Sequence, residues 1–207
     1  MRADEVAQYL QDNPQFFEDH AETLAQINLP HPHGGRTISL GERQLLALRE
    51  KNRELERKLR EMISVAQDND ALQHKVHEFV IALFVARDLA TLTEMIPHLM
   101  RDIFAIPHTV LRLWQSDPPS AEVLAFADAQ AQPVCLHHPA RDTAAWFDGH
   151  ASQLHSYAYL PLRKDADTTG LLVLASEDKQ RFYPEMGTVF LQRIAEAVSS
   201  ALQPWLD

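Results

Sequence analysis

The sequence has 207 residues, a formal charge of −10 and a pI near 5.5, which argue against nonspecific binding to nucleic acid or to anionic membranes. Its single cysteine, Cys135, excludes an internal disulfide bond and fits a reducing compartment. Because no apolar stretch is long enough for a signal peptide or a membrane span, we expect a cytoplasmic protein that does not enter the membrane.

Residues 1–38 are predicted to form short helices. Asn13-Pro14 is typical of a helix start, with a capping residue before a proline at the first helical position. The prolines and glycines of residues 29–35 predict a turn or linker. The aromatic side chains of this segment need cover, either from the rest of the chain and a dimer partner or from another protein. Its apolar residues form two small sets: Val6, Tyr9 and Leu10, then Phe16, Phe17, Leu24 and Ile27.

A single long helix is predicted over residues 39–87, because this run has no proline and, after Gly41, no glycine. Its apolar residues repeat every seven positions, which is typical of a coiled coil. A narrow stripe on a helix about 75 Å long needs a second helix to cover it, and another copy of the chain is the simplest source. The predicted dimer interface consists of Leu45, Leu48, Asn52, Leu55, Leu59, Met62, Ala66, Val76, Val80 and Leu83.

The polar residues of this helix favour two parallel strands. Asn52 occupies an a position, where asparagine specifies a parallel pair in register at a cost in stability. Lys51 at g would face Glu56 at e of the second helix. Acidic residues alternate with basic ones on the outer face, so we expect a solvated surface and no nucleic-acid contacts. Two favourable pairs four residues apart lie there: Glu54–Lys58 and Glu56–Arg60.

The helix is predicted to serve two purposes, because its apolar stripe becomes broader beyond Met62. The second half should therefore meet additional structure, and we divide the chain into a helical segment (1–38), a coiled-coil helix (39–74) and a globular domain (75–207). Two capping boxes, Ser39–Glu42 and Thr91–Glu94, mark the expected starts of helices.

The globular domain is predicted to belong to the α+β class, with an antiparallel sheet flanked by helices. Alternation along 109–114 places Thr109, Leu111 and Leu113 on one face of the sheet and Val110, Arg112 and Trp114 on the other. The expected elements are helix 91–104, strands 109–114, 122–127 and 134–136, short helix 143–149, a hairpin of strands 156–162 and 170–176, and a last helix opened by Pro184.

Two sets of short motifs, one in each half of the sequence, resemble known protein families. Residues 156–162 (SYAYLPL), residues 170–176 (GLLVLAS) and Arg181-Phe182 resemble the last third of a GAF sensor domain. Residues 14–17 (PQFF), 29–32 (LPHP) and 48–52 (LREKN) resemble the uncharacterised bacterial family known as domain of unknown function 484. Members of that family combine a helical N-terminus, a coiled coil and a GAF-like domain, and the resemblance implies no assigned activity.

The GAF resemblance implies a regulatory role, since such domains bind small molecules or serve only as dimerisation modules. It places a ligand on the sheet face opposite the terminal helices, although it leaves the ligand or cofactor unknown. An arginine among aromatic rings could hold an anionic or planar ligand, or the rings could fill a collapsed pocket. The pattern linked to cyclic-nucleotide binding is missing, which disfavours that ligand. The candidate ligand-binding residues are Arg112, Trp114, Trp146, Phe147, Tyr157 and Tyr159.

Other chemistry has weaker support in the sequence. Cys135 lies between Val134 and Leu136 and is expected to be a buried strand residue. We expect no metal site, because the histidines lack CxxC or HExxH spacing; the looser groupings are His74 with His77, and His137, His138, His150 and His155. No phosphate-binding glycine loop, GxSxG turn or paired-carboxylate pattern is present, so we expect no catalytic residues.

These observations lead to one expectation and one alternative. We expect a non-enzymatic homodimer in which a parallel coiled coil joins two GAF-like domains that act as a regulatory or sensor module, and whose sheet face could hold a small molecule. The alternative is a ligand-free adaptor that recruits a protein partner through the N-terminal segment or the coiled coil.

Overall fold

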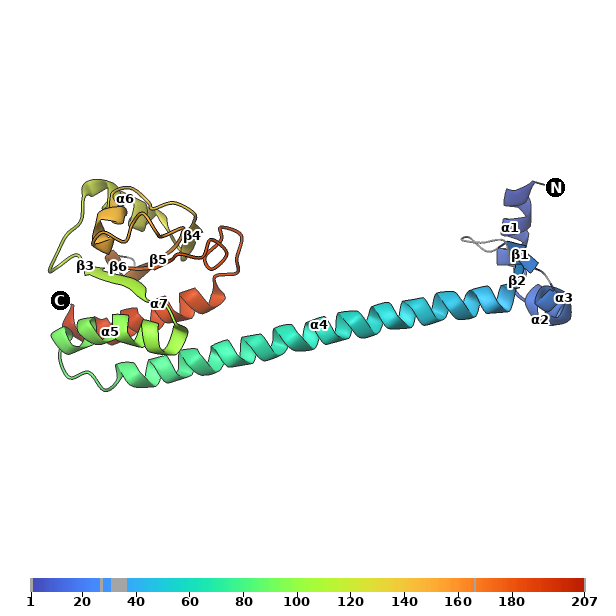
Figure 1. The fold of residues 1–207 in the computed structure, drawn as a ribbon, viewed down its shortest axis with the longest axis horizontal. Coiled ribbons are helices and arrows are strands. Elements are labelled where there is room, and N and C mark those ends of the chain that lie inside the picture. The colour runs from blue at the N-terminus through green and yellow to red at the C-terminus, as the bar shows by residue number, and fades with distance from the viewer. Residues whose placement is uncertain (1, 27, 31–36, 166, 207) are drawn as a thin grey trace. The chain divides into compact units, whose positions relative to one another are not determined.

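The structure, a computed structural model, describes residues 2–26, 28–30, 37–165 and 167–206 (Figure 1). The chain divides into two compact units, Met1–Ala66 and Gln67–Asp207, and one helix, α4 (Leu40–Leu83), contributes to both. The predicted long helix is therefore confirmed, although it ends four residues before the expected position. The side chains of its predicted capping box, Ser39 and Glu42, lie outside the described part.

The first unit contains short helices and a small hairpin. The aromatic rings of α1 and α2 lie against one another, with the Phe16 ring 6.5 Å from Tyr9 and 6.1 Å from Phe17. The prediction was wrong at two points: α2 begins at Phe16 while Asn13 lies at the C-terminal end of α1, and part of the expected linker forms β1. The elements are α1 (Ala3–Asp12), α2 (Phe16–Asp19), α3 (Ala21–Gln26) and the antiparallel strands β1 (Asn28–Pro30) and β2 (Thr37–Ser39).

The two predicted ion pairs on the outer face of α4 are confirmed. Lys58 Nζ lies 2.8 Å from Glu54 Oε1, and Arg60 Nη1 lies 4.0 Å from Glu56 Oε2. All four side chains are exposed, so each pair contributes a few tenths of a kcal/mol at most. Among the described residues, no helix has both the length and the apolar character needed to cross a membrane.

The second unit is built on a four-stranded antiparallel sheet in the order β3–β6–β5–β4. The α+β class and the hairpin of β5 and β6 are confirmed. The hairpin reverses direction at Asp165, whose φ of 57° lies in the left-handed region that aspartate tolerates in turns. The strands are β3 (His108–Leu113), β4 (Val134–Leu136), β5 (Ser156–Lys164) and β6 (Asp167–Ser176).

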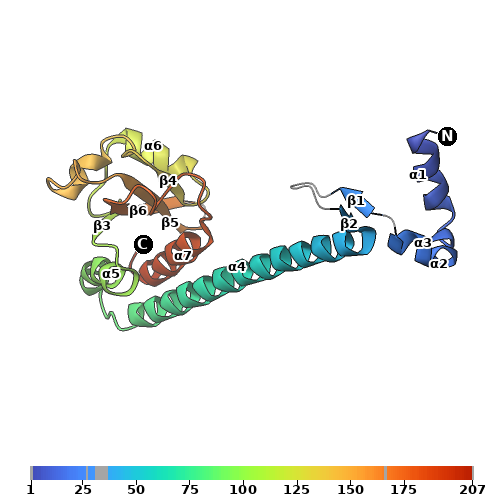
Figure 2. The same ribbon diagram turned by 45° about the vertical axis from the view of Figure 1, so that its right-hand side comes forward.

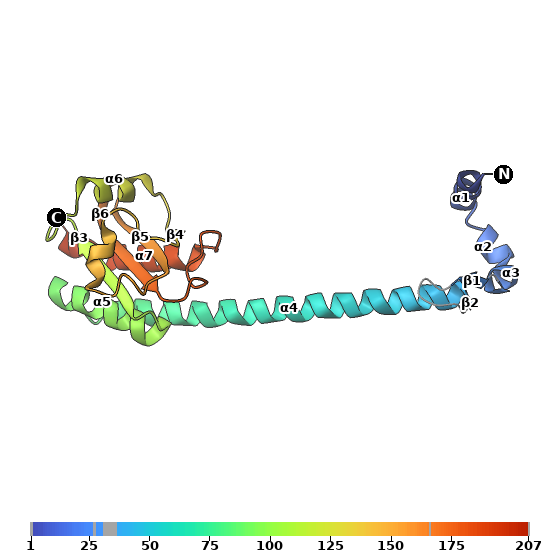
Figure 3. The same ribbon diagram turned by 45° about the horizontal axis from the view of Figure 1, so that its top comes forward.

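Helices cover both faces of this sheet, as Figure 2 and Figure 3 show. On one face, α5 (Leu89–Phe104), α7 (Val189–Leu202) and the end of α4 enclose the larger core, which includes Phe79, Met100 and Val198. On the other face, α6 (Ala121–Ala129) and the 3-10 segment η1 (Thr143–Phe147) enclose a smaller core. A final 3-10 turn, η2 (Gln203–Trp205), follows α7.

Several elements of this unit differ from the sequence prediction. The expected strand 122–127 is wrong, because these residues form α6, where the Ser120 hydroxyl accepts a hydrogen bond from Val123 N–H at 3.4 Å. Helix α5 begins at Leu89 and not at Thr91, because the Asp88 carboxylate caps it by accepting the Thr91 N–H at 2.7 Å, which lowers the pKa of Asp88. Helix α7 begins at Val189, five residues after Pro184.

Gly170 allows β3 and β6 to lie side by side. A Cβ atom at this position would come 2.6 Å from the carbonyl oxygen of Arg112 and 2.9 Å from Leu113 Cδ2. Gly170→Ala should therefore lower the free energy of unfolding by about 1–3 kcal/mol, measured by urea denaturation. At Gly187 an added Cβ meets no atom within 4 Å, so Gly187→Ala is a matched control with a change within about 0.5 kcal/mol. Equal midpoints for both variants would contradict this packing.

Candidate functional site

The six candidate ligand-binding residues separate into two groups in the structure. Phe147, Tyr157 and Tyr159 are buried in the smaller core between the sheet and its covering segments α6 and η1. Arg112, Trp114 and Trp146 are only partly buried. Strand alternation had correctly placed Arg112 and Trp114 on the same face as these tyrosines, but it could not show how deep each side chain lies.

The two tyrosines and their aromatic neighbours fill the sheet face. The rings of Tyr157 and Tyr159 stack with centroids 6.4 Å apart, and neither residue is exposed. Phe126 of α6 packs edge-on against Tyr159 at 5.3 Å, and Phe147 packs edge-on against Tyr157 at 6.0 Å. These are favourable aromatic geometries, so this face is closed by side chains of the chain itself.

The hydroxyl of Tyr159 closes a small ring of hydrogen bonds. Its oxygen accepts the Ala140 N–H at 2.8 Å, and the hydroxyl lies 2.8 Å from Thr143 Oγ1. Because Thr143 donates its own proton to the Ala140 carbonyl at 2.6 Å, Tyr159 is the donor to Thr143. Burial raises the pKa of Tyr159, so its hydroxyl stays protonated and can donate to Thr143. The ring ties β5 to the segment that leads into η1.

Arg112 and Trp146 instead line a groove of about 730 Å³ beside β3. The Arg112 guanidinium forms an ion pair with Asp117 and lies 5.3 Å above the centre of the Trp146 ring. An anionic ligand would therefore compete with Asp117 for this arginine. The groove is lined by Leu89, Ala90 and Thr93 of α5, by residues of β3, and by Ser116, Asp117, Trp146 and Asp148.

Trp114 lies apart from this groove. Its side chain packs against the smaller core, and its indole Nε1 is buried without a hydrogen-bond partner among the residues that the structure describes. The sequence identified Arg112 and Trp146 but missed Thr93, Asp117 and Asp148, which come from a helix, a turn and a loop. These three residues lie far apart in the sequence and follow no regular spacing, so no sequence pattern indicates that they line the same groove.

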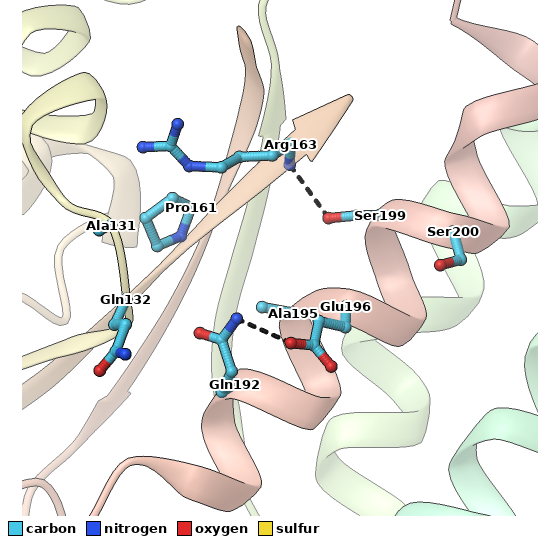
Figure 4. A pocket seen from close by; sticks show the side chains of 9 residues that line it. All are labelled: Ala131, Gln132, Pro161, Arg163, Gln192, Ala195, Glu196, Ser199 and Ser200. Carbon is cyan, nitrogen blue, oxygen red and sulfur yellow. Dashed lines mark hydrogen bonds between the residues drawn. The ribbon is translucent and has the colours of Figure 1, made fainter. Parts of the chain in front are cut away.

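A smaller pocket of about 200 Å³ lies between β5 and α7 (Figure 4). The backbone N–H of Arg163 donates to Ser199 Oγ at 3.1 Å, while its guanidinium points away from α7 and donates to the carbonyls of Asp128 and Gln130. Gln192 donates to Glu196 at 2.9 Å along the same helix. These bonds join the hairpin to α7 and to the end of α6, so we assign the pocket a structural role.

The histidines and the cysteine also have defined places. His137, His138 and His155 line a third cavity of about 540 Å³ together with Lys179, and the rings of His108 and His150 lie 5.4 Å apart. Across the described residues, no three His, Cys, Asp or Glu side chains are arranged to hold a metal ion. Cys135 is buried in β4, and burial raises the pKa of its thiol to about 11.

The residues predicted for the dimer interface divide at about residue 70. Leu45, Leu48, Leu55, Leu59 and Met62 are exposed by 48–69%, and Asn52 and Ala66 are exposed too. Val76 and Leu83 are buried in the larger core of their own chain, with Val80 packed against it. The domain of the same chain thus covers Val76 and Leu83 and part of Val80. The dimer interface itself stays a prediction.

Comparison with known proteins gives a family and uncharacterised relatives. Residues 1–207 match the model of the family described as protein of unknown function, DUF484. The chain is 26% identical to the uncharacterized protein YigA of Shigella flexneri and 25% identical to that of Escherichia coli (strain K12). Each alignment of 217 residues covers 98% of this chain and 91% of the relative.

One solved structure is also similar. It is the GAF domain of an Acinetobacter phosphoenolpyruvate-protein phosphotransferase, with a TM-score of 0.44 and 13% sequence identity. The alignment covers 67% of the present chain and 93% of the GAF-domain chain.

The hydrogen-bond ring predicts unequal effects of removing the two tyrosine hydroxyls. Tyr159→Phe leaves the buried Ala140 N–H without its acceptor, so the free energy of unfolding should fall by about 1–3 kcal/mol. Tyr157→Phe is the control, because its hydroxyl makes only a 3.4 Å contact with the Leu154 carbonyl, and it should cost less than about 1 kcal/mol. Urea denaturation of both variants measures the difference, and a larger loss for Tyr157→Phe would refute the assignment.

The environment of Cys135 predicts an inert thiol. With a pKa of about 11, about one thiol in a thousand is ionised at pH 8, and the side chain is buried as well. In the native protein, the rate of reaction with a disulfide reagent such as DTNB should be limited by the rate at which the structure opens and exposes Cys135. The urea-unfolded chain should react at the rate of a free cysteine. Equal rates in the two states would mean that Cys135 is accessible and reactive.

Proposed function

The chain belongs to the DUF484 family of proteins of unknown function, and from this premise we propose that it is a non-enzymatic, homodimeric regulatory module with a GAF-like domain. A parallel coiled coil would hold two copies together, and the module would act through contacts with other proteins. The observation that carries the proposal is the exposed apolar seam of α4 between Leu45 and Met62.

The seam supports a second copy of the chain as its cover. Full burial of a leucine or methionine side chain contributes about 1.5–3 kcal/mol, and five such side chains recur at a and d positions. Asn52 at the a position favours two parallel strands, and Lys51 at g complements Glu56 at e of a second helix. A partner with the same heptad pattern in the same register satisfies all of these features at once.

In this proposal the a and d residues of α4 are covered by a second chain in one part of the helix and by the core of their own chain in the other. Asn69 and Gln73 interrupt the apolar pattern, and from Val76 onward the a and d positions contact the core of the same chain. We infer that the coiled coil covers residues 45–66. The helix that forms the dimer is then also a wall of the domain core, so a change in the packing of residues 76–83 acts directly on the element that carries the seam.

The closed sheet face supports action through protein contacts over small-molecule sensing. A ligand on this face would have to displace Tyr157 and Tyr159, which are buried and stacked. A non-enzymatic role is supported by Arg112, which pairs with Asp117, and by Cys135, whose thiol is buried and protonated at neutral pH. Small-molecule sensing is the second candidate, favoured by the aromatic and charged groove beside β3.

Native mass spectrometry tests the pairing directly. The full chain should appear at twice its mass of 23.5 kDa, and Leu55→Glu should shift it to the monomer, because a charge at d cannot be buried in the seam. Ser64→Glu is the matched control: it adds the same charge at an outer f position and should remain dimeric.

A wild-type monomer at micromolar concentration would overturn the proposal of a homodimer. A small molecule that copurifies and adds a fixed mass to each chain would favour the sensor over the module that acts through protein contacts alone.

A further inference from the structure

Strand β3 lies at an edge of the sheet, and its outer side bears backbone groups that the sheet does not use. The Trp114 N–H donates to the Thr169 carbonyl of the neighbouring chain segment at 2.9 Å. Because antiparallel pairs alternate, Arg112 and Val110 also bond toward β6, whereas the N–H groups of Thr109, Leu111 and Leu113 point away from it. Within the described residues, β3 pairs with β6 alone.

This edge is recessed and not flat. The groove of about 730 Å³ runs along it, with Leu89, Ala90 and Thr93 of α5 on one side and Trp146 and Asp148 on the other. The turn after β3 closes one end, because the Leu113 carbonyl accepts hydrogen bonds from Ser116 and Asp117 N–H. Among the residues that the structure describes, the edge groups without a backbone partner are those of Thr109 and Leu111 and the N–H of Leu113.

We propose that this groove binds an extended peptide segment of a partner protein, which adds a fifth strand to the sheet beside β3. Peptide addition to a sheet edge draws affinity from main-chain hydrogen bonds and specificity from alternate side chains. A strand is the occupant that offers donors and acceptors at the spacing of Thr109 and Leu111. The proposal rests on the suggested action through protein contacts, but it does not need the dimer, since the groove lies within one C-terminal unit.

The two walls of the groove define the chemistry of this peptide. Side chains of an added strand would alternate between the α5 wall, which offers Leu89 and Ala90, and the opposite wall, which offers Trp146 and Asp148. The first wall suits small apolar side chains. The second suits a basic side chain such as arginine, because the Asp148 carboxylate has no ion pair among the described residues. Asp117 already pairs with Arg112, whose guanidinium also lies over the Trp146 ring. The expected segment therefore alternates apolar and basic residues.

The walls also argue against a second copy of β3 as the occupant. Two edges that pair directly must approach to about 4.8 Å, the spacing of strands in a sheet. Here α5 and η1 flank the edge, so pairing of two copies would also have to fit the flanking segments of both copies around one seam. A single extended chain fits between the walls.

The test uses a fluorescein-labelled heptapeptide of alternating valine and arginine, titrated into the full chain and followed by fluorescence anisotropy. N-methyl groups at residues 2, 4 and 6 block the amides on one edge of the peptide, and those at residues 3, 5 and 7 block the other. One set should weaken binding by about tenfold or more, because it removes hydrogen bonds to β3, and the other should not. Equal weakening by both sets, or no binding of the parent peptide, would overturn the proposal.

Two pairs of protein variants place the peptide in the groove. Ala90→Trp fills the groove from an exposed position and should weaken binding about tenfold or more, while Ala121→Trp, at the exposed start of α6, should leave it unchanged. Asp148→Asn should weaken binding, while Glu185→Gln removes the same charge elsewhere and should not. If Ala90→Trp and Asp148→Asn bind the peptide as tightly as their control variants, the peptide does not bind in this groove.

The mass of each variant is measured in parallel. If the wild type is monomeric but still binds the peptide in the groove, only the homodimer proposal is overturned. If the wild type is dimeric but does not bind the peptide in the groove, only this inference is overturned.

Discussion

Phe79 of α4 is completely buried and packs edge-on against Phe104 of α5, with ring centroids 5.7 Å apart. This contact makes the last two turns of a 44-residue helix part of the core of the C-terminal unit. Earlier turns of the same helix carry apolar residues in the same heptad register but leave them exposed. Burial of one end of this stripe within the chain organises the domain, and exposure of its other end is the basis of the proposed dimer.

The sheet of the C-terminal unit leaves few places for recognition. Its two central strands, β5 and β6, are buried over most of their length, and helices or aromatic side chains close both faces. The remaining polar backbone lies at the edges, where natural proteins protect or use unpaired strands. At β3 the structure surrounds the edge with α5, Trp146 and the Arg112–Asp117 pair, so that edge is the part of the sheet best suited to a partner.

The groove and the core share one helix. Leu89, Ala90 and Thr93 at the start of α5 form a wall of the groove, while Phe104 at its end contacts Phe79 of α4. A segment bound beside β3 would therefore press on a helix that also packs against α4. This packing connects the proposed binding site with the helix that carries the proposed dimer seam, and coupling between them would need α5 or α4 to have two arrangements that both sites bias.

The sequence by itself determined the long helix, the class of the domain and the sides of β3, because the periods of 3.6 and 2 report locally which side chains must be buried. The family resemblance came from separate motifs, such as residues 14–17 and 48–52. The sequence identified Arg112 and Trp146 correctly as neighbours but could not connect them with Asp117, Thr93 or Asp148. Only the tertiary structure decided that residues 121–129 form a helix, since their short apolar run fits either period and the helix buries Val123 and Ala127 together in the smaller core. It also decided which tyrosines are buried and where the stripe of α4 enters the core of its own chain, because a pattern shows that a surface needs cover and not which element provides it.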